Sequence, residues 1–193
     1  TINPAIYAWN SRGKIMNNQI SNVKMNGIVI NNSESIEIFN NKITDVNGSA
    51  ISIIDNSKCE IHHNSISKIE SNGLFINNKS KVNIHHNELS QIRCPAIAIL
   101  MKSKANLTEN KISDINSCGI RINNAKEVEI DHNEINNIKE ETNVAVSASN
   151  ISFLLICPNS LTIMKYARDK RRCFLNKESS KKASITILQM ISI

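Results

Sequence analysis

The sequence predicts an all-β solenoid, and three observations lead to this: its composition, a fixed 23-residue period and alternating apolar residues. The 193 residues include 34 Ile and 30 Asn but only 7 aromatic residues. Ile favours strands because its branched Cβ packs well on a pleated surface. Asn favours turns because it tolerates left-handed backbone and hydrogen-bonds to neighbouring groups. Such a chain indicates many short strands joined by tight turns.

Two columns of residues define the period. Asparagine recurs every 23 residues without a gap, at Asn18, Asn41, Asn64, Asn87, Asn110 and Asn133. Nine residues after each Asn stands a small residue, in the order Gly27, Ala50, Gly73, Ala96 and Gly119, and then Thr142. A fixed period of this length indicates a solenoid. We interpret the asparagines as turn residues whose amides hydrogen-bond from coil to coil, rather than as a ligand-binding ladder. The small column indicates a corner without room for side-chain bulk, or a backbone that needs positive φ.

The strands are expected where apolar residues alternate. Ten and twelve residues after the Asn come the pairs Ile28/Ile30, Ile51/Ile53, Leu74/Ile76, Ile97/Ile99 and Ile120/Ile122. Similar pairs lie eighteen and twenty residues after it, from Ile36/Ile38 to Ile151/Phe153. This is the period of a strand with one buried face. Two or three short strands cannot close a core alone, so successive coils must stack in register. The sequence therefore predicts a single-stranded parallel β-helix with six to seven coils of about 23 residues.

The pattern "NxIxxIxxxGIxI", followed by an "IxI" strand, resembles the right-handed parallel β-helix repeats of pectin-lyase-like proteins. The stretch "CPAIAI" at 94–99, echoed by "NPAIYA" at 3–8, is similar to the carbohydrate-binding and sugar-hydrolase type of repeat. That type also occurs in F-box-only ubiquitin-ligase receptors and in a periplasmic accessory protein for nitrous oxide reductase. The resemblance covers about 3–155 and implies a right-handed helix. It implies little about activity, because one scaffold hosts many functions.

The ends of the chain depart from the period. Residues 4–18 match 95–110 with one residue deleted, and the phase slips near 142–146. We therefore divide the chain into β-helix repeats at 1–156 and a basic tail at 157–193. The tail is either a cap for the last coil, with a helix near 164–176 and a strand near 184–192, or a non-native extension.

Charge and cysteines limit the partners and the compartment. Residues 1–156 hold 15 basic and 15 acidic residues, so the whole net charge of +6 lies in the tail. The repeat body is therefore not expected to bind nucleic acid. No apolar run reaches the ~18 residues of a membrane helix, and we expect a monomer. The five cysteines form no CxxC motif, which favours a reducing, cytoplasmic compartment; the compartment is otherwise unassigned.

The candidate site lies where outward-facing polar residues form columns. Nineteen and twenty-one residues after the Asn, the sequence places Glu60, His62, His85 and Asp131 on one strip. His62 and His85, with Glu60 beside them, offer at most a two-histidine surface site. We expect no metal, because strand alternation sends His63 and His86 to the other side. Polar residues tolerated on an exposed strand are the simpler interpretation.

These columns do not indicate a catalytic site. The face beside the first strand pair carries Arg121 but no acid cluster, and one arginine without a calcium site does not make a lyase. We therefore predict a non-catalytic binding module without cofactors, which recognises a protein partner or a glycan along its elongated face. The resemblance to F-box-type receptors implies substrate recognition for ubiquitination. The alternative is a fragment of a secreted polysaccharide lyase, hydrolase or epimerase.

Overall fold

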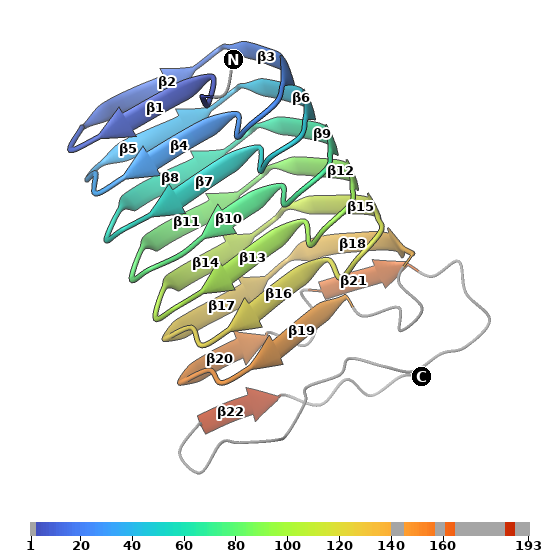
Figure 1. Cartoon of the computed structure of the whole chain (residues 1–193). Helices are drawn as coiled ribbons and strands as arrows, with labels where there is room; N and C mark the ends of the chain where they lie inside the picture. The colour runs from blue at the N-terminus through green and yellow to red at the C-terminus, as the bar shows by residue number, and fades with distance from the viewer. Residues whose placement is uncertain (1–2, 140–144, 157–160, 165–183, 188–193) are drawn as a thin grey trace.

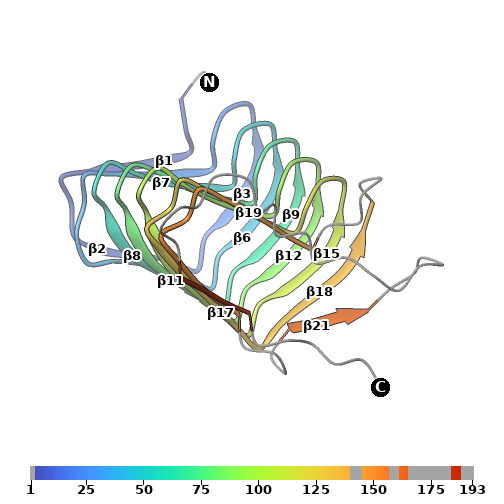
Figure 2. The same ribbon diagram turned by 90° about the horizontal axis from the view of Figure 1, so that it is seen from below.

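A computed structural model describes residues 3–139, 145–156, 161–164 and 184–187 of the chain. Each coil contributes three short strands to three parallel sheets, as Figure 1 shows. Seen along the stack in Figure 2, the three sheets form the sides of the coil. No helix occurs in the described residues. The predicted all-β parallel solenoid is confirmed.

The strands of the first sheet, called sheet A, are β1 (Ile6–Trp9), β4 (Ile28–Asn31), β7 (Ile51–Ile54), β10 (Leu74–Ile76), β13 (Ile97–Leu100), β16 (Ile120–Asn123) and β19 (Val146–Ser149). Sheet B consists of β2 (Gly13–Met16), β5 (Ile36–Phe39), β8 (Lys58–His62), β11 (Lys81–His85), β14 (Lys104–Thr108), β17 (Glu127–Asp131), β20 (Phe153–Ile156) and β22 (Ser184–Ile187). Sheet C consists of β3 (Gln19–Val23), β6 (Lys42–Val46), β9 (Ser65–Ile69), β12 (Glu88–Ile92), β15 (Lys111–Ile115), β18 (Asn133–Ile138) and β21 (Leu161–Met164). The seven strands of sheet A agree with the six to seven coils predicted.

The register follows the sequence period. Residues 23 apart face each other in most strand pairs, as Ile84 faces Ile61. The first coil is one residue shorter, since Ile6 faces Ile28. The last is longer, since Ile120 faces Val146. Both departures confirm the deletion and the phase slip seen in the sequence.

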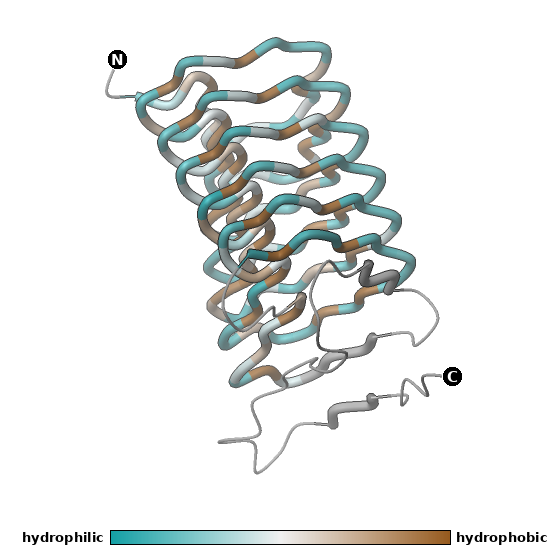
Figure 3. The backbone as a smooth tube through the Cα atoms, turned by 90° about the vertical axis from the view of Figure 1, so that its right-hand side faces the viewer, coloured by the Kyte–Doolittle hydropathy of each residue, from teal (hydrophilic) through white to brown (hydrophobic). Residues whose placement is uncertain are grey.

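The core is a stack of aliphatic side chains inside the coils. Figure 3 shows apolar positions recurring at the same place in successive coils. Ile38, Ile61 and Ile84 are fully buried in neighbouring strands of sheet B. Along β8 and β11, the residues that alternate with the buried ones point outward, as expected of a strand with one buried face.

The asparagine column is a buried hydrogen-bond ladder. The Asn87 side chain donates to the Asn110 Oδ1 at 3.0 Å and to the carbonyls of Ile61 and His85 at 2.8 and 3.0 Å. Its Oδ1 accepts from the backbone N–H and the side-chain amide of Asn64, at 3.1 and 2.9 Å. The coil-to-coil amide interpretation is confirmed. The left-handed backbone, however, belongs to the residue before each Asn, such as His86 at φ 53°.

The small-residue column is explained by space. Gly73 does not have positive φ. A Cβ on Gly73 would lie 2.6 Å from the Ala96 carbonyl oxygen and 2.8 Å from side-chain atoms of Leu89 and Ile92. Of the two explanations offered by the sequence, lack of room at the corner holds here.

Two strands of the predicted tail extend the sheets. β21 pairs with β18, and β22 pairs with β20. The strand predicted near 184–192 is present over 184–187. Met164, at the start of the predicted helix near 164–176, is the last residue of β21; residues 165–176 lie outside the described residues. The division at residue 156, and the choice between a cap and a non-native extension, stay predictions.

Candidate functional site

The predicted strip lies on the outer face of sheet B. β8 places Glu60 and His62 outward, and β11 places His85 next to His62. The two imidazoles stack with ring centroids 4.9 Å apart and planes within 2°. The Phe39 ring continues the stack, 5.0 Å from His62. The sequence therefore placed Glu60, His62 and His85 together correctly, but stacked rings do not point their nitrogens at one ion.

Carboxylates pair with histidines of the next coil. Glu37 Oε1 lies 3.1 Å from His62 Nε2, and Glu60 Oε1 lies 3.1 Å from His85 Nε2. Each carboxylate thus pairs with an imidazole of the next coil along the chain, and Glu60 does so rather than with His62 on its own strand. Glu60 is therefore a partner of His85.

His63 and His86 do not turn away, so that prediction was wrong. His63 Nδ1 lies 2.9 Å from His62 Nδ1, and His86 Nδ1 lies 3.1 Å from His85 Nδ1. Both His63 and His86 have left-handed backbone, with φ of 53°. A left-handed residue interrupts the two-residue alternation of a strand, so consecutive side chains lie side by side at this corner. The four imidazoles form a two-by-two group, which we call the histidine array.

Asp131 does not join this group. The strand register places Thr108 between His85 and Asp131, so two coils separate the carboxylate from the array. That separation is about 10 Å at the spacing of sheet strands. The Asp131 carboxylate instead lies 2.9 Å from the Nδ1 of His132, the next residue along the chain.

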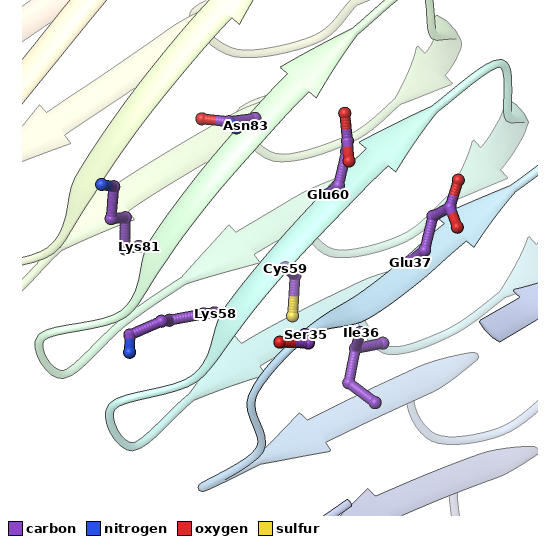
Figure 4. Close-up of a pocket in the computed structure, with 8 residues that line it drawn as sticks. All are labelled: Ser35, Ile36, Glu37, Lys58, Cys59, Glu60, Lys81 and Asn83. Atoms are coloured by element: carbon purple, nitrogen blue, oxygen red, sulfur yellow. The ribbon is translucent and has the colours of Figure 1, made fainter. Parts of the chain in front are cut away.

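A groove runs along the opposite edge of the same outer face. One hollow of about 420 Å³ is lined by Ser35, Ile36, Glu37, Lys58, Cys59, Glu60, Lys81 and Asn83, which Figure 4 draws. A second, of about 260 Å³, is lined by Lys81, Val82, Asn83, Lys104, Ala105, Asn106, Glu127 and Glu129. Because Lys81 and Asn83 line both, the two hollows are continuous. We call them together the sheet B groove.

The sheet B groove has a cationic column beside an acidic and amide column. Lys58, Lys81 and Lys104 face one another on successive strands. The neighbouring outward column carries Glu60, Asn83 and then Asn106. These lysines were not among the predicted site residues, although each stands seventeen residues after an Asn of the period, which is the signal that identifies them.

Lysine side chains lower the pKa of three carboxyl groups on this side of the coil, those of Glu34, Glu37 and Glu127. The Lys14 ammonium lies 2.7 Å from Glu37 and, together with His62, lowers the pKa of that carboxyl. Lys58 lowers the pKa of Glu34 from 2.9 Å, and Lys104 lowers that of Glu127 in the same way. A general acid for glycoside cleavage needs a raised pKa. Glu37 is therefore suited to accept hydrogen bonds rather than to donate a proton.

The outer face of sheet A differs in chemistry. Its outward residues include Tyr7, Trp9, Val29 and Phe75. Tyr7 and Trp9 are 56% and 61% exposed. The exposed aromatic side chains of sheet A thus lie on its first strand, β1, whereas the outer face of sheet B is polar.

Across the described residues, no three or more His, Cys, Asp or Glu side chains converge on a position for a metal ion. Nor do those residues form a helix with the length and apolarity needed to cross a membrane. The fold and the outer faces therefore define a parallel β-helix whose side chains are presented in columns.

The chain belongs to the family described as "right handed beta helix region", whose model matches residues 4–155. This agrees with the resemblance noted in the sequence; the pectin-lyase-like subtype is compatible with it. Neither the curated proteins nor the solved structures contain a match to the chain.

Proposed function

We propose that this β-helix protein is a non-catalytic module that binds an extended polysaccharide in the sheet B groove. The observation that carries the proposal is the continuity of the groove over successive coils, through the shared residues Lys81 and Asn83. Strands in a sheet repeat every ~4.8 Å, which is close to the length of one sugar unit in an extended chain. A repeating polymer can therefore meet equivalent side chains on each coil.

The side chains of the groove suit sugar hydroxyls. Asn83 and Asn106 each offer an amide donor and an acceptor, and Glu60 offers acceptors. Lys81 forms no ion pair with any described residue, so its ammonium can donate to a ligand. The ionised state of Glu37 supports binding rather than acid catalysis.

The test is affinity electrophoresis of the full chain through gels that contain neutral or uronic-acid polysaccharides. We expect at least one polysaccharide to retard the native protein, and Asn83→Ala and Lys81→Met to weaken the binding about tenfold each, which is about 1.4 kcal/mol. Lys111→Met, on the exposed start of β15 in sheet C, is the matched control and should bind like the unmodified protein. Equal retardation of all four proteins, or none by any polysaccharide, would contradict the proposal.

The enzyme alternative has its own measurement. Release of reducing ends or of unsaturated products from a retarding polysaccharide should stay at background for the unmodified protein. Release that disappears in Glu37→Gln or Glu60→Gln would establish the alternative and overturn the non-catalytic proposal.

A protein partner is a second candidate, favoured by the two exposed aromatic side chains on β1 of sheet A. Exposed Tyr7 and Trp9 are residue types enriched at protein interfaces. Tyr7→Ser and Trp9→Ser would weaken the binding of such a partner and leave the retardation by polysaccharide unchanged. Substrate recognition for ubiquitination stays a prediction from the resemblance alone.

A further inference from the structure

The His85–His86 pair of the histidine array has an unusual hydrogen-bond arrangement. The two rings meet nearly at right angles, at 86°, with their Nδ1 atoms 3.1 Å apart. His85 is 25% exposed and His86 46% exposed at the side chain, so water and ions reach both.

Carboxylates fix the other nitrogen of both rings. Glu60 Oε1 lies 3.1 Å from His85 Nε2, and Glu109 Oε2 lies 2.6 Å from His86 Nε2. An ionised carboxylate only accepts hydrogen bonds, so each Nε2 must carry a hydrogen. A neutral imidazole has one N–H, so both Nδ1 atoms then carry lone pairs. Two lone pairs that face each other at 3.1 Å repel unless a cation lies between or beside them.

We propose that the Nδ1 atoms of His85 and His86 chelate one divalent late first-row transition-metal ion, of the Cu²⁺ or Ni²⁺ class. Imidazole nitrogens suit these ions. A carboxylate on the far nitrogen is the usual support of a metal-binding histidine, because it fixes the tautomer and raises the basicity of the ligand.

The distance between the nitrogens favours particular ions. With metal–nitrogen bonds of about 2.0–2.1 Å, two nitrogens 3.1 Å apart subtend an angle of about 95–100° at the metal. That angle is closer to the right angle of square-planar or octahedral coordination than to a tetrahedral one. Since no third His, Cys, Asp or Glu of the described chain converges there, water completes the coordination.

The His62–His63 pair is a natural comparison within the same array. Its Nδ1 atoms are 2.9 Å apart, and Glu37 contacts His62 Nε2. No carboxylate of the described residues contacts the Nε2 of His63. His63 is therefore free to carry its hydrogen on Nδ1 and donate it to His62, so this pair is satisfied without a cation.

The substitutions can be taken from the same column. Asn40 occupies the same position one coil before His63 and two coils before His86, with the same φ of 53°. His86→Asn and His63→Asn should therefore both keep the fold, which circular dichroism checks. Glu109→Gln removes the carboxylate from His86 and keeps the shape of the side chain.

The experiment is titration calorimetry of the tag-free full chain with Ni²⁺, together with electron paramagnetic resonance of the Cu²⁺ form. We expect one tight site per chain and a Cu²⁺ spectrum with two nitrogen ligands. His86→Asn should lose the site and the two-nitrogen spectrum. Glu109→Gln should weaken binding ten- to a hundredfold, while His63→Asn binds normally.

Three results would overturn the proposal. One is Ni²⁺ binding that is equal in the unmodified chain and in His86→Asn. The second is the absence of binding by the folded chain, in which case the pair shares a proton instead. The third is a loss in His63→Asn as large as in His86→Asn. Glu60 belongs to both the groove and the His85 pair, but neither of the two histidines nor Glu109 lines the groove. His86→Asn and Glu109→Gln should therefore impair metal binding without changing polysaccharide retardation, which keeps the two proposals distinguishable.

Discussion

The buried asparagine column and the exposed column just before it share one period but obey different constraints. Asn41, Asn64, Asn87 and Asn110 are all at most 1% exposed, and each amide bonds to the next coil. The preceding positions carry Asn40, His63, His86 and Glu109, all with left-handed backbone and very different side chains. Burial of hydrogen-bonding groups therefore demands one residue type, whereas the backbone alone accepts several.

The largest effect should come from breaking the buried column. Asn87→Ala removes two accepted hydrogen bonds and three donor contacts, which share the two hydrogens of the amide. At about 1 kcal/mol for each of these four hydrogens, the free energy of unfolding should fall by about 4 kcal/mol. Urea denaturation measures it, and Asn106→Ala on the exposed face of β14 should change it by less than about 0.5 kcal/mol. A loss below about 1 kcal/mol for Asn87→Ala would show that the ladder is not what holds the corner.

Cysteine reactivity should show the same contrast between inside and outside. Burial raises the pKa of the Cys59 thiol to about 12, which lowers its thiolate fraction about a thousandfold. Cys94 is half-buried at the surface. Iodoacetamide at pH 8 should modify Cys94 and spare Cys59 in the native protein, as read by peptide mass spectrometry. In urea the two should react alike; equal rates in the native protein would refute the burial of Cys59.

A smaller effect should come from the small-residue column. Gly73→Ala forces a methyl group against the Ala96 carbonyl oxygen and should cost about 1–3 kcal/mol in the free energy of unfolding. Ala50→Gly, at the same position in another coil, should cost only about 0.5–1 kcal/mol through backbone entropy. Thermal denaturation of both variants gives the comparison, and a neutral Gly73→Ala would mean that the corner relaxes.

The smallest effect concerns pH. Partial loss of hydration, together with the imidazoles of His62, His86 and His85, lowers the pKa of His63. The unfolded chain then binds this proton more tightly than the native chain, so stability should fall as the pH drops below the ordinary histidine value, about 6.5. His63→Asn should flatten the dependence between pH 7.5 and 5.5, whereas His132→Asn, outside the array, should not. Denaturation midpoints at several pH values test this.

The period made the fold predictable because every coil must present the same groups to its neighbours. Ile84, Asn87 and Gly73 could be assigned from spacing alone, since core filling, hydrogen bonding and close packing each restrict the residue type. The histidine array could not, because strict alternation was assumed through His63 and His86. Their left-handed backbone cannot be inferred from residue type, because side chains as different as those of Asn40, Glu109 and His132 occupy the same conformation.

Which histidine each carboxylate of the site contacts could not be predicted from the sequence either. Glu60 was expected beside His62, but its side chain reaches the imidazole of the next coil instead. Strand register fixes which residues are neighbours, while rotamers decide which neighbour a long side chain meets. The lysine column, in contrast, follows the 23-residue spacing and was predictable from it.

The corner that precedes each asparagine repeats once per coil. At the two corners of the histidine array, two consecutive side chains lie side by side at the surface. Adding or removing a 23-residue coil would change the length of the rows by one strand spacing and leave every remaining corner as it was. For the proposed polysaccharide, the number of coils would set the length of chain that the groove can match, while the corner residues could change without altering that length.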